Sequence, residues 1–126
     1  MDKLKILVVD DESRMRKLVR DFLVKQNFEV LEAGDGAEAL DIFFGTEGIA
    51  LVILDVMMPK MNGYEATRAI RLSDRPDAAT VPIVAMTANA FAEDVQTAKE
   101  AGMNDHVSKP IQLDILKEAL AKYRHG

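Results

Sequence analysis

Acidic residues follow two separate apolar runs of the chain, and this placement suits metal and phosphate chemistry. Asp55 ends the apolar run 51–54, and Asp10 and Asp11 follow the run 4–9. A carboxylate at the end of a buried strand is costly unless something pairs with it. Each one should therefore reach the rim of the fold, where it can meet solvent, a metal ion or a ligand. Taken alone, each of these carboxylates could be a helix cap or an ordinary surface group.

Two further predicted strands end in groups that fit the same chemistry. Residues 81–86 lead into Thr87, and residues 106–108 lead into Lys109. A hydroxyl and an ammonium group both donate hydrogen bonds to phosphoryl oxygens. Three converging carboxylates would repel one another, and a hard cation such as Mg²⁺ removes that repulsion. The set predicts a Mg²⁺ site that receives a phosphoryl group.

These side chains meet only if the apolar runs are strands of one sheet. The predicted strands cover residues 4–9, 28–32, 51–55, 81–86 and 106–108. A helical pattern follows each of them, at about 15–23, 37–44, 66–73, 90–101 and 113–123. Connections of this kind imply parallel pairing with right-handed crossovers. The expected fold class is α/β: a doubly wound, five-stranded parallel sheet of order 2-1-3-4-5, flavodoxin-like, with three layers. In such sheets ligands bind beyond the carboxyl ends of the strands, where the strand order reverses.

The first predicted helix has an apolar face and a basic side. Its core face carries Met15, Leu18, Val19, Phe22 and Leu23 at helical spacing. Its other side is covered by Arg14, Arg16, Lys17, Arg20 and Lys25. Ser13 or Asp11 is the expected N-cap of this helix, and Asp35 that of the next. Residues 74–80 are expected to form a polar loop.

Composition excludes several classes of protein. The chain has 126 residues, 48% of them hydrophobic, a net charge of -5 and no cysteine. The negative charge argues against direct binding to nucleic acid or to anionic membranes. The lack of cysteine excludes disulfides and thiolate metal sites. We expect one cytoplasmic domain over residues 1–126, without an output domain.

The motifs resemble the receiver (phosphoacceptor) domain of bacterial two-component response regulators, in a form similar to the chemotaxis regulators. The resemblance spans about residues 3–123 and rests on Asp10-Asp11, Asp55 with Pro59 and Gly63 downstream, Thr87-Ala88 and Lys109-Pro110. It implies that Asp55 accepts a phosphoryl group from a histidine kinase or a phosphotransfer protein, in a Mg²⁺-dependent reaction. Such a domain is a signalling module that promotes only its own phosphorylation and dephosphorylation.

The resemblance also assigns ligands to the metal. Asp11 and Asp55 would bind Mg²⁺ directly and Asp10 through water, and the backbone carbonyl of Met57 would be a further ligand. Lys109 would pair with the phosphoryl oxygens, after a Lys109-Pro110 peptide that is expected to be cis.

The remaining implied roles concern the switch and its partners. Thr87 would hydrogen-bond to the phosphoryl group and move toward it on activation. His106 stands where the family usually has an aromatic switch residue. The shift would reach a downstream effector on the face formed by the helix at 90–101, the strand at 106–108 and the last helix. The domain would be a monomer or a weak, phosphorylation-dependent homodimer.

Two other classes of protein share parts of this pattern. A Mg²⁺-dependent phosphatase with an aspartate nucleophile usually has a second acid two residues later, where this chain has Met57. An FMN-binding, flavodoxin-like module needs a hydroxyl- and glycine-rich phosphate loop after the first strand. The acidic residues 10–12 would instead repel phosphate when no metal is bound.

Overall fold

The computed structural model describes residues 3–56, 61–87, 92–108 and 113–123, and only the backbone of residues 92–95, 108 and 123. These residues form a parallel sheet of order β2-β1-β3-β4-β5. The strands are β1 (Lys5–Val9), β2 (Glu29–Ala33), β3 (Ile49–Asp55), β4 (Ile83–Thr87) and β5 (Asp105–Ser108). The helices are α1 (Ser13–Lys25), α2 (Gly36–Gly45), α3 (Gly63–Arg71), α4 (Ala92–Ala101) and α5 (Leu113–Tyr123), with a short 3₁₀ helix η1 (Pro76–Ala79). The predicted fold class and strand order are confirmed.

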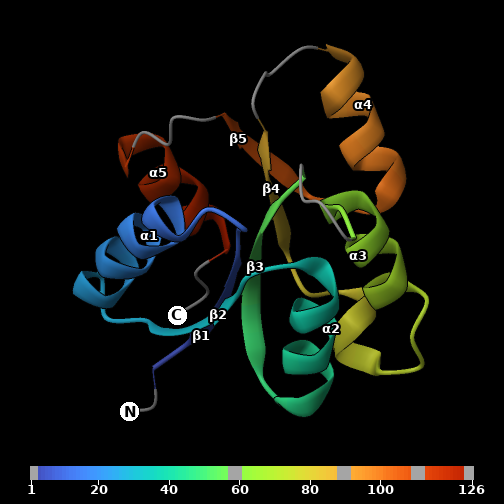
Figure 1. Cartoon of the computed structure of the whole chain (residues 1–126), viewed down its shortest axis with the longest axis horizontal. Helices are drawn as coiled ribbons and strands as arrows, with labels where there is room; N and C mark the ends of the chain where they lie inside the picture. The colour runs from blue at the N-terminus through green and yellow to red at the C-terminus, as the bar shows by residue number, and fades with distance from the viewer. Residues whose placement is uncertain (1–2, 57–60, 88–91, 109–112, 124–126) are drawn as a thin grey trace.

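Two hydrophobic cores hold three layers together. Helices α1 and α5 cover one face of the sheet, and α2, α3 and α4 cover the other (Figure 1). Successive side chains of a strand point to opposite faces. In β3, Val52 and Leu54 therefore join the core under α2, α3 and α4, whereas Leu51 and Ile53 join the core under α1 and α5. This explains the unbroken apolar run before Asp55.

The start of α1 differs from the prediction that Ser13 or Asp11 caps it. Glu12 occupies the N-cap position, and no side chain makes a cap hydrogen bond there. Ser13 is instead the first helical residue. The prediction for α2 is confirmed, because the carboxylate of Asp35 accepts a hydrogen bond from the Glu38 N–H at 2.8 Å.

Three local predictions need correction. Leu18 was expected on the core face of α1, but it is 44% exposed because Val19 and Leu23 form the centre of the buried stripe. The strand β2 runs one residue later than predicted, from Glu29 to Ala33. The segment 74–80 contains η1, where Pro76 favours the first helical turn.

The amino ends of β4 and β5 are tied to α3. The Asn104 side-chain oxygen accepts hydrogen bonds from the Ile83 N–H at 2.9 Å and from the Arg71 guanidinium at 2.8 Å. Arg71 also donates to the carbonyls of Gly102 and Ala78. Burial lowers the pKa of Arg71 from its usual value. These bonds fix the end of the sheet opposite the acidic residues.

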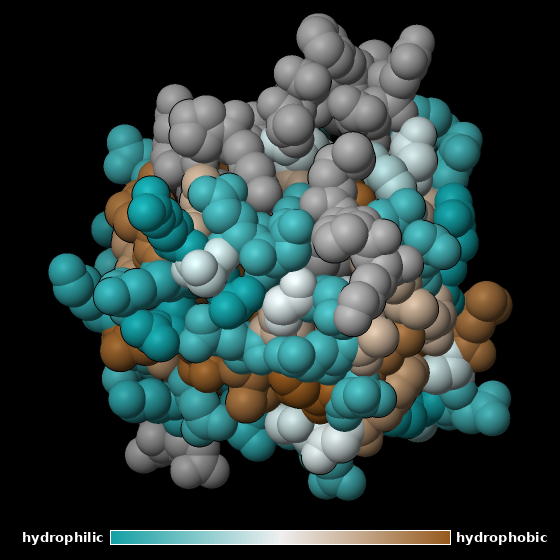
Figure 2. All heavy atoms as spheres, viewed as in Figure 1, coloured by the Kyte–Doolittle hydropathy of each residue, from teal (hydrophilic) through white to brown (hydrophobic). Residues whose placement is uncertain are grey.

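The surface is mixed in character. Hydrophilic side chains cover most of the described surface seen in Figure 2, and hydrophobic residues show between them, chiefly across the lower half of the view. Among the described residues, no helix combines the length and the apolar character that crossing a membrane requires.

Candidate functional site

Three carboxylates gather at the carboxyl ends of β1 and β3. Each of Asp10, Asp11 and Asp55 offers one oxygen, and these oxygens all lie within 4.8 Å of one another. The cause is the parallel register of β1 and β3, in which Val9 pairs with Leu54. Asp10 then follows Val9 where Asp55 follows Leu54. The fold thus brings Asp55 close to two acids, Asp10 and Asp11, that are far from it in the sequence.

The three acids differ in burial. Asp10 is 0% exposed and Asp55 is 2% exposed, whereas Asp11 is exposed. Two carboxylates therefore form the floor of the site, and the third stands at its solvent side. A set of three carboxylate oxygens suits a hard divalent cation such as Mg²⁺ or Ca²⁺ far better than a metal that prefers sulfur or nitrogen. The described donors fit a magnesium ion that keeps part of its water shell.

Three hydrogen bonds hold the turn that carries Asp10 and Asp11. The Asp10 N–H donates to the carbonyl of Ala33 in β2 at 3.1 Å. The Asp10 carboxylate oxygen Oδ1 accepts the Glu12 N–H at 2.9 Å. Arg16 donates from Nη1 to the carbonyl oxygen of Asp10 at 2.6 Å. Both sides of the Asp10 residue are thus tied to neighbouring elements.

Sequence reasoning missed the part that Arg16, Arg20 and Glu32 play near the site. It assigned both arginines to the side of α1 opposite the core face and gave Glu32 no role. In the structure, Glu32 of β2 accepts from Arg16 Nε and from Arg20 Nη1, both at 3.2 Å. The available signal was their spacing, because residues four apart share one face of a helix. The hydrogen bond with Asp21, and then that with Glu32, raises the pKa of Arg20.

Thr87 ends β4 on the face of the sheet that α3 and α4 cover. Thr87 is 2% exposed, and its hydroxyl oxygen makes no hydrogen bond among the described residues. A buried hydroxyl without a partner costs about 1–3 kcal/mol. Such a group is suited to donate to a ligand oxygen that arrives at the carboxyl end of the sheet.

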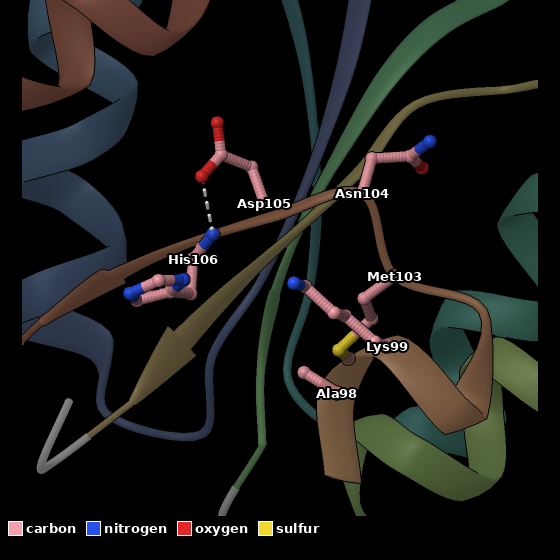
Figure 3. Close-up of a pocket in the computed structure, with 6 residues that line it drawn as sticks. All are labelled: Ala98, Lys99, Met103, Asn104, Asp105 and His106. Carbon is pink, nitrogen blue, oxygen red and sulfur yellow. Dashed lines mark hydrogen bonds between the residues drawn. The ribbon is translucent and has the colours of Figure 1, made fainter. Parts of the chain in front are cut away.

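His106 lies on β5, on the same face of the sheet as Thr87. It pairs with Ala85, which precedes Thr87 by two residues, so the three share a face. His106 is half-buried and lines a hollow of about 230 Å³ between α4 and β5. Figure 3 shows Ala98 and Lys99 on α4 near this hollow, and the hydrogen bond from the His106 N–H to Asp105 at 2.9 Å.

Gly63 brings the start of α3 against the backbone of Asp55. A Cβ atom at position 63 would lie 2.5 Å from the Asp55 carbonyl oxygen and 2.9 Å from the Val56 Cα. The helix then begins with a capping box, in which Asn62 and Glu65 exchange side-chain and backbone hydrogen bonds. Gly63 therefore sets how closely α3 approaches the end of β3.

We expect Gly63→Ala to destabilise the protein by about 2 kcal/mol, because the new methyl group meets backbone that must shift. Urea unfolding measures this change. Gly45→Ala is the matched control, since nothing lies within 4 Å of its Cβ position at the end of α2. The control should be neutral or stabilising by up to about 1 kcal/mol. Equal effects of the two substitutions would contradict the close approach.

Several predicted site residues lie outside the described residues. These are Met57, Lys109 and the Lys109-Pro110 peptide, and their predicted roles stay predictions. Of the residues predicted from sequence, the structure brings Asp10, Asp11 and Asp55 together. It places Thr87 at the end of the neighbouring strand β4, and His106 further along the same face.

Comparisons with known proteins agree on one family. The model of the response regulator receiver domain matches residues 6–121. The chain is 42% identical over 122 residues to the sensor histidine kinase RcsC of Salmonella typhimurium. That match covers 97% of this chain and 12% of the relative, so the chain spans only a small part of that kinase's length.

Solved structures give the same result. The chemotaxis protein CheY4 of Vibrio cholerae matches with a TM-score of 0.90 and 30% identity, over 98% of this chain and 100% of that one. The receiver domain of a sensor histidine kinase from Pseudomonas aeruginosa matches with a TM-score of 0.86 and 30% identity, over 97% and 98% of the two chains. That structure has a magnesium ion coordinated in the active-site cleft.

Proposed function

This chain belongs to the response regulator receiver domain family, and on that premise we propose that Asp55 is the residue that accepts the phosphoryl group. The observation that carries the proposal is the cluster of Asp10, Asp11 and Asp55 within 4.8 Å at the rim of the sheet. Asp55 is the member of the cluster on β3; it is 2% exposed and lies beside two other acids that can share a cation with it. The phosphoryl donor is a phosphohistidine of a kinase or a phosphotransfer protein.

We assign the magnesium ion to the three carboxylates. Asp11 and Asp55 would bind it directly, and Asp10 would act through a water molecule. The backbone carbonyl of Met57 is a further proposed ligand. A cation held by these carboxylates would offset the repulsion among them and would withdraw charge from the phosphoryl oxygens. This support comes from the all-oxygen donor set and from the magnesium ion in the structure from P. aeruginosa.

The chemistry is an in-line displacement at phosphorus. A carboxylate oxygen of Asp55 forms the new oxygen–phosphorus bond while the phosphorus–nitrogen bond breaks, and its electron pair returns to the donor imidazole. Lys109 is proposed to neutralise the phosphoryl oxygens, and the Thr87 hydroxyl donates a hydrogen bond to one of them. Because Thr87 is buried without a hydrogen-bond partner among the described residues, binding the phosphoryl oxygen satisfies that group.

The switch follows from the same face of the sheet. When the Thr87 hydroxyl turns toward the phosphoryl group, it leaves room on its face of the sheet. His106 lies on that same face, beside α4. We propose that this biases two arrangements of His106 and presents the α4-β5-α5 face to a downstream effector. The domain acts as a monomer or as a weak homodimer that phosphorylation favours.

Acetyl phosphate tests the proposal without the natural partner. With Mg²⁺, the chain should take up one phosphoryl group as an acid-stable, base-labile acyl phosphate, separated on a phosphate-affinity gel. No uptake with Mg²⁺ would contradict the proposal. Repeated release of phosphate from a phosphomonoester would instead favour the phosphatase alternative.

A further inference from the structure

We propose that Arg16 is a positioning residue that fixes the turn carrying Asp10 and Asp11 in the geometry that Mg²⁺ requires. This inference rests on the proposed function, because it concerns the same metal site. Arg16 stands outside the acidic cluster and acts through the backbone of Asp10. Arg16 would affect the position of the carboxylates, whereas the carboxylates would bind the metal. The two effects can therefore be measured separately.

Arg16 joins three elements at one guanidinium group. It lies on α1, its Nη1 donates to the Asp10 carbonyl oxygen after β1, and its Nε donates to Glu32 on β2. Its side chain is 22% exposed and that of Glu32 is 31% exposed, so the bridge is partly shielded from water. The planar group of arginine can make both bonds in a fixed geometry, whereas the single nitrogen of lysine cannot copy that fork.

The bridge adds the side-chain bond that the start of α1 otherwise lacks, since Glu12 at the N-cap makes no side-chain cap bond. The other bonds on the turn hold the Asp10 N–H and the Asp10 carboxylate, and only the one from Arg16 holds the Asp10 carbonyl among the bonds described for this turn. The carbonyl that Arg16 binds belongs to the peptide unit between Asp10 and Asp11. Rotation of that unit would move both acids, one of which is buried and one exposed. A charged donor on its oxygen at 2.6 Å restrains that rotation.

Charge and geometry predict opposite effects on metal binding. Arg16 is a cation near a cation site, so its charge alone weakens binding of Mg²⁺, and removing it should strengthen binding. Loss of the bond to Asp10 loosens the turn, and should weaken binding. Outer-sphere partners of metal ligands typically contribute 10–100-fold to metal affinity. We therefore expect the geometric effect to exceed the effect of charge.

The experiment measures Mg²⁺ affinity by titrating MgCl₂ into ¹⁵N-labelled protein and following amide shifts around Asp10, Asp11 and Asp55. Arg16→Lys keeps the charge and loses the fork, and should weaken Mg²⁺ binding about tenfold. Arg16→Met loses both, and should also weaken it. Arg20→Met is the matched control, because it removes the same charge and the other arginine on Glu32, but no bond to Asp10. This control should change affinity less than about twofold.

The outcomes separate this inference from the proposed function. Wild-type protein without Mg²⁺-dependent shifts at the acids would overturn the metal site itself, and this inference with it. Wild-type binding with Arg16→Lys within twofold of it would overturn the role of Arg16 alone. Tighter binding by Arg16→Met would do the same, because it would mean that charge dominates. Urea unfolding without Mg²⁺ confirms that each variant is folded before its affinity is compared.

Discussion

Asp55→Asn is expected to abolish phosphoryl uptake from acetyl phosphate, with a loss of rate of at least about a thousandfold. An amide lacks the anionic oxygen that attacks phosphorus, and loss of a nucleophile commonly costs that much or more. The measurement is the fraction of phosphorylated chain against time at fixed Mg²⁺. Because Asn and Asp are nearly the same size, the variant should fold as the wild type does.

Asp41→Asn is the control for this loss. It makes the same chemical change at an exposed acid on α2, away from the cluster. Its uptake rate should equal that of the wild type. Uptake by Asp55→Asn at a wild-type rate would assign the phosphoryl group to another residue, and the proposed chemistry would be wrong.

Asp11→Asn is expected to weaken Mg²⁺ binding at least about tenfold, since losing a ligand should cost no less than losing an outer-sphere partner. The same substitution should raise the urea midpoint of unfolding in EDTA, because it removes one of three clustered negative charges. A lower Mg²⁺ affinity together with a higher urea midpoint in EDTA is the result expected of carboxylates that are clustered to bind a cation. A lower midpoint in EDTA together with unchanged Mg²⁺ affinity would show that Asp11 has a structural role only.

The gathering of the acids followed from elementary rules applied to the sequence. Apolar runs separated by helices imply a parallel sheet, and a parallel sheet brings the carboxyl ends of its strands to one rim. Residue types along the chain therefore predict that Asp10, Asp11 and Asp55 lie together with Thr87 beside them. The prediction worked because strand burial and crossover direction depend on residue types that are readable along the chain.

The bonds that hold the site were less predictable. Helical periodicity correctly put Arg16 on the polar side of α1, away from the core face. A long side chain can nevertheless reach back over its own first turn to the end of a strand. Which carbonyl it meets depends on how α1 sits on the sheet, and this is a tertiary property. The uncapped start of α1 and the exposure of Leu18 have the same origin.

Gly63 shows the same limit in another form. The helix was expected from about residue 66, because Asn62-Gly63 is typical of a turn, whereas α3 begins at Gly63. Its contact with the Asp55 backbone joins residues that the helix start and the strand end bring together only in the folded chain. The motif in the sequence marked the residue, and packing against β3 supplied the reason for it.

The most direct test of the central claim is to locate the phosphoryl group. Chain phosphorylated by acetyl phosphate and Mg²⁺ is reduced with borohydride, which converts an aspartyl phosphate to homoserine, and is then sequenced by mass spectrometry. We predict homoserine at position 55 and unmodified aspartate at positions 10 and 11. Homoserine at position 10 or 11 with intact Asp55 would contradict the account.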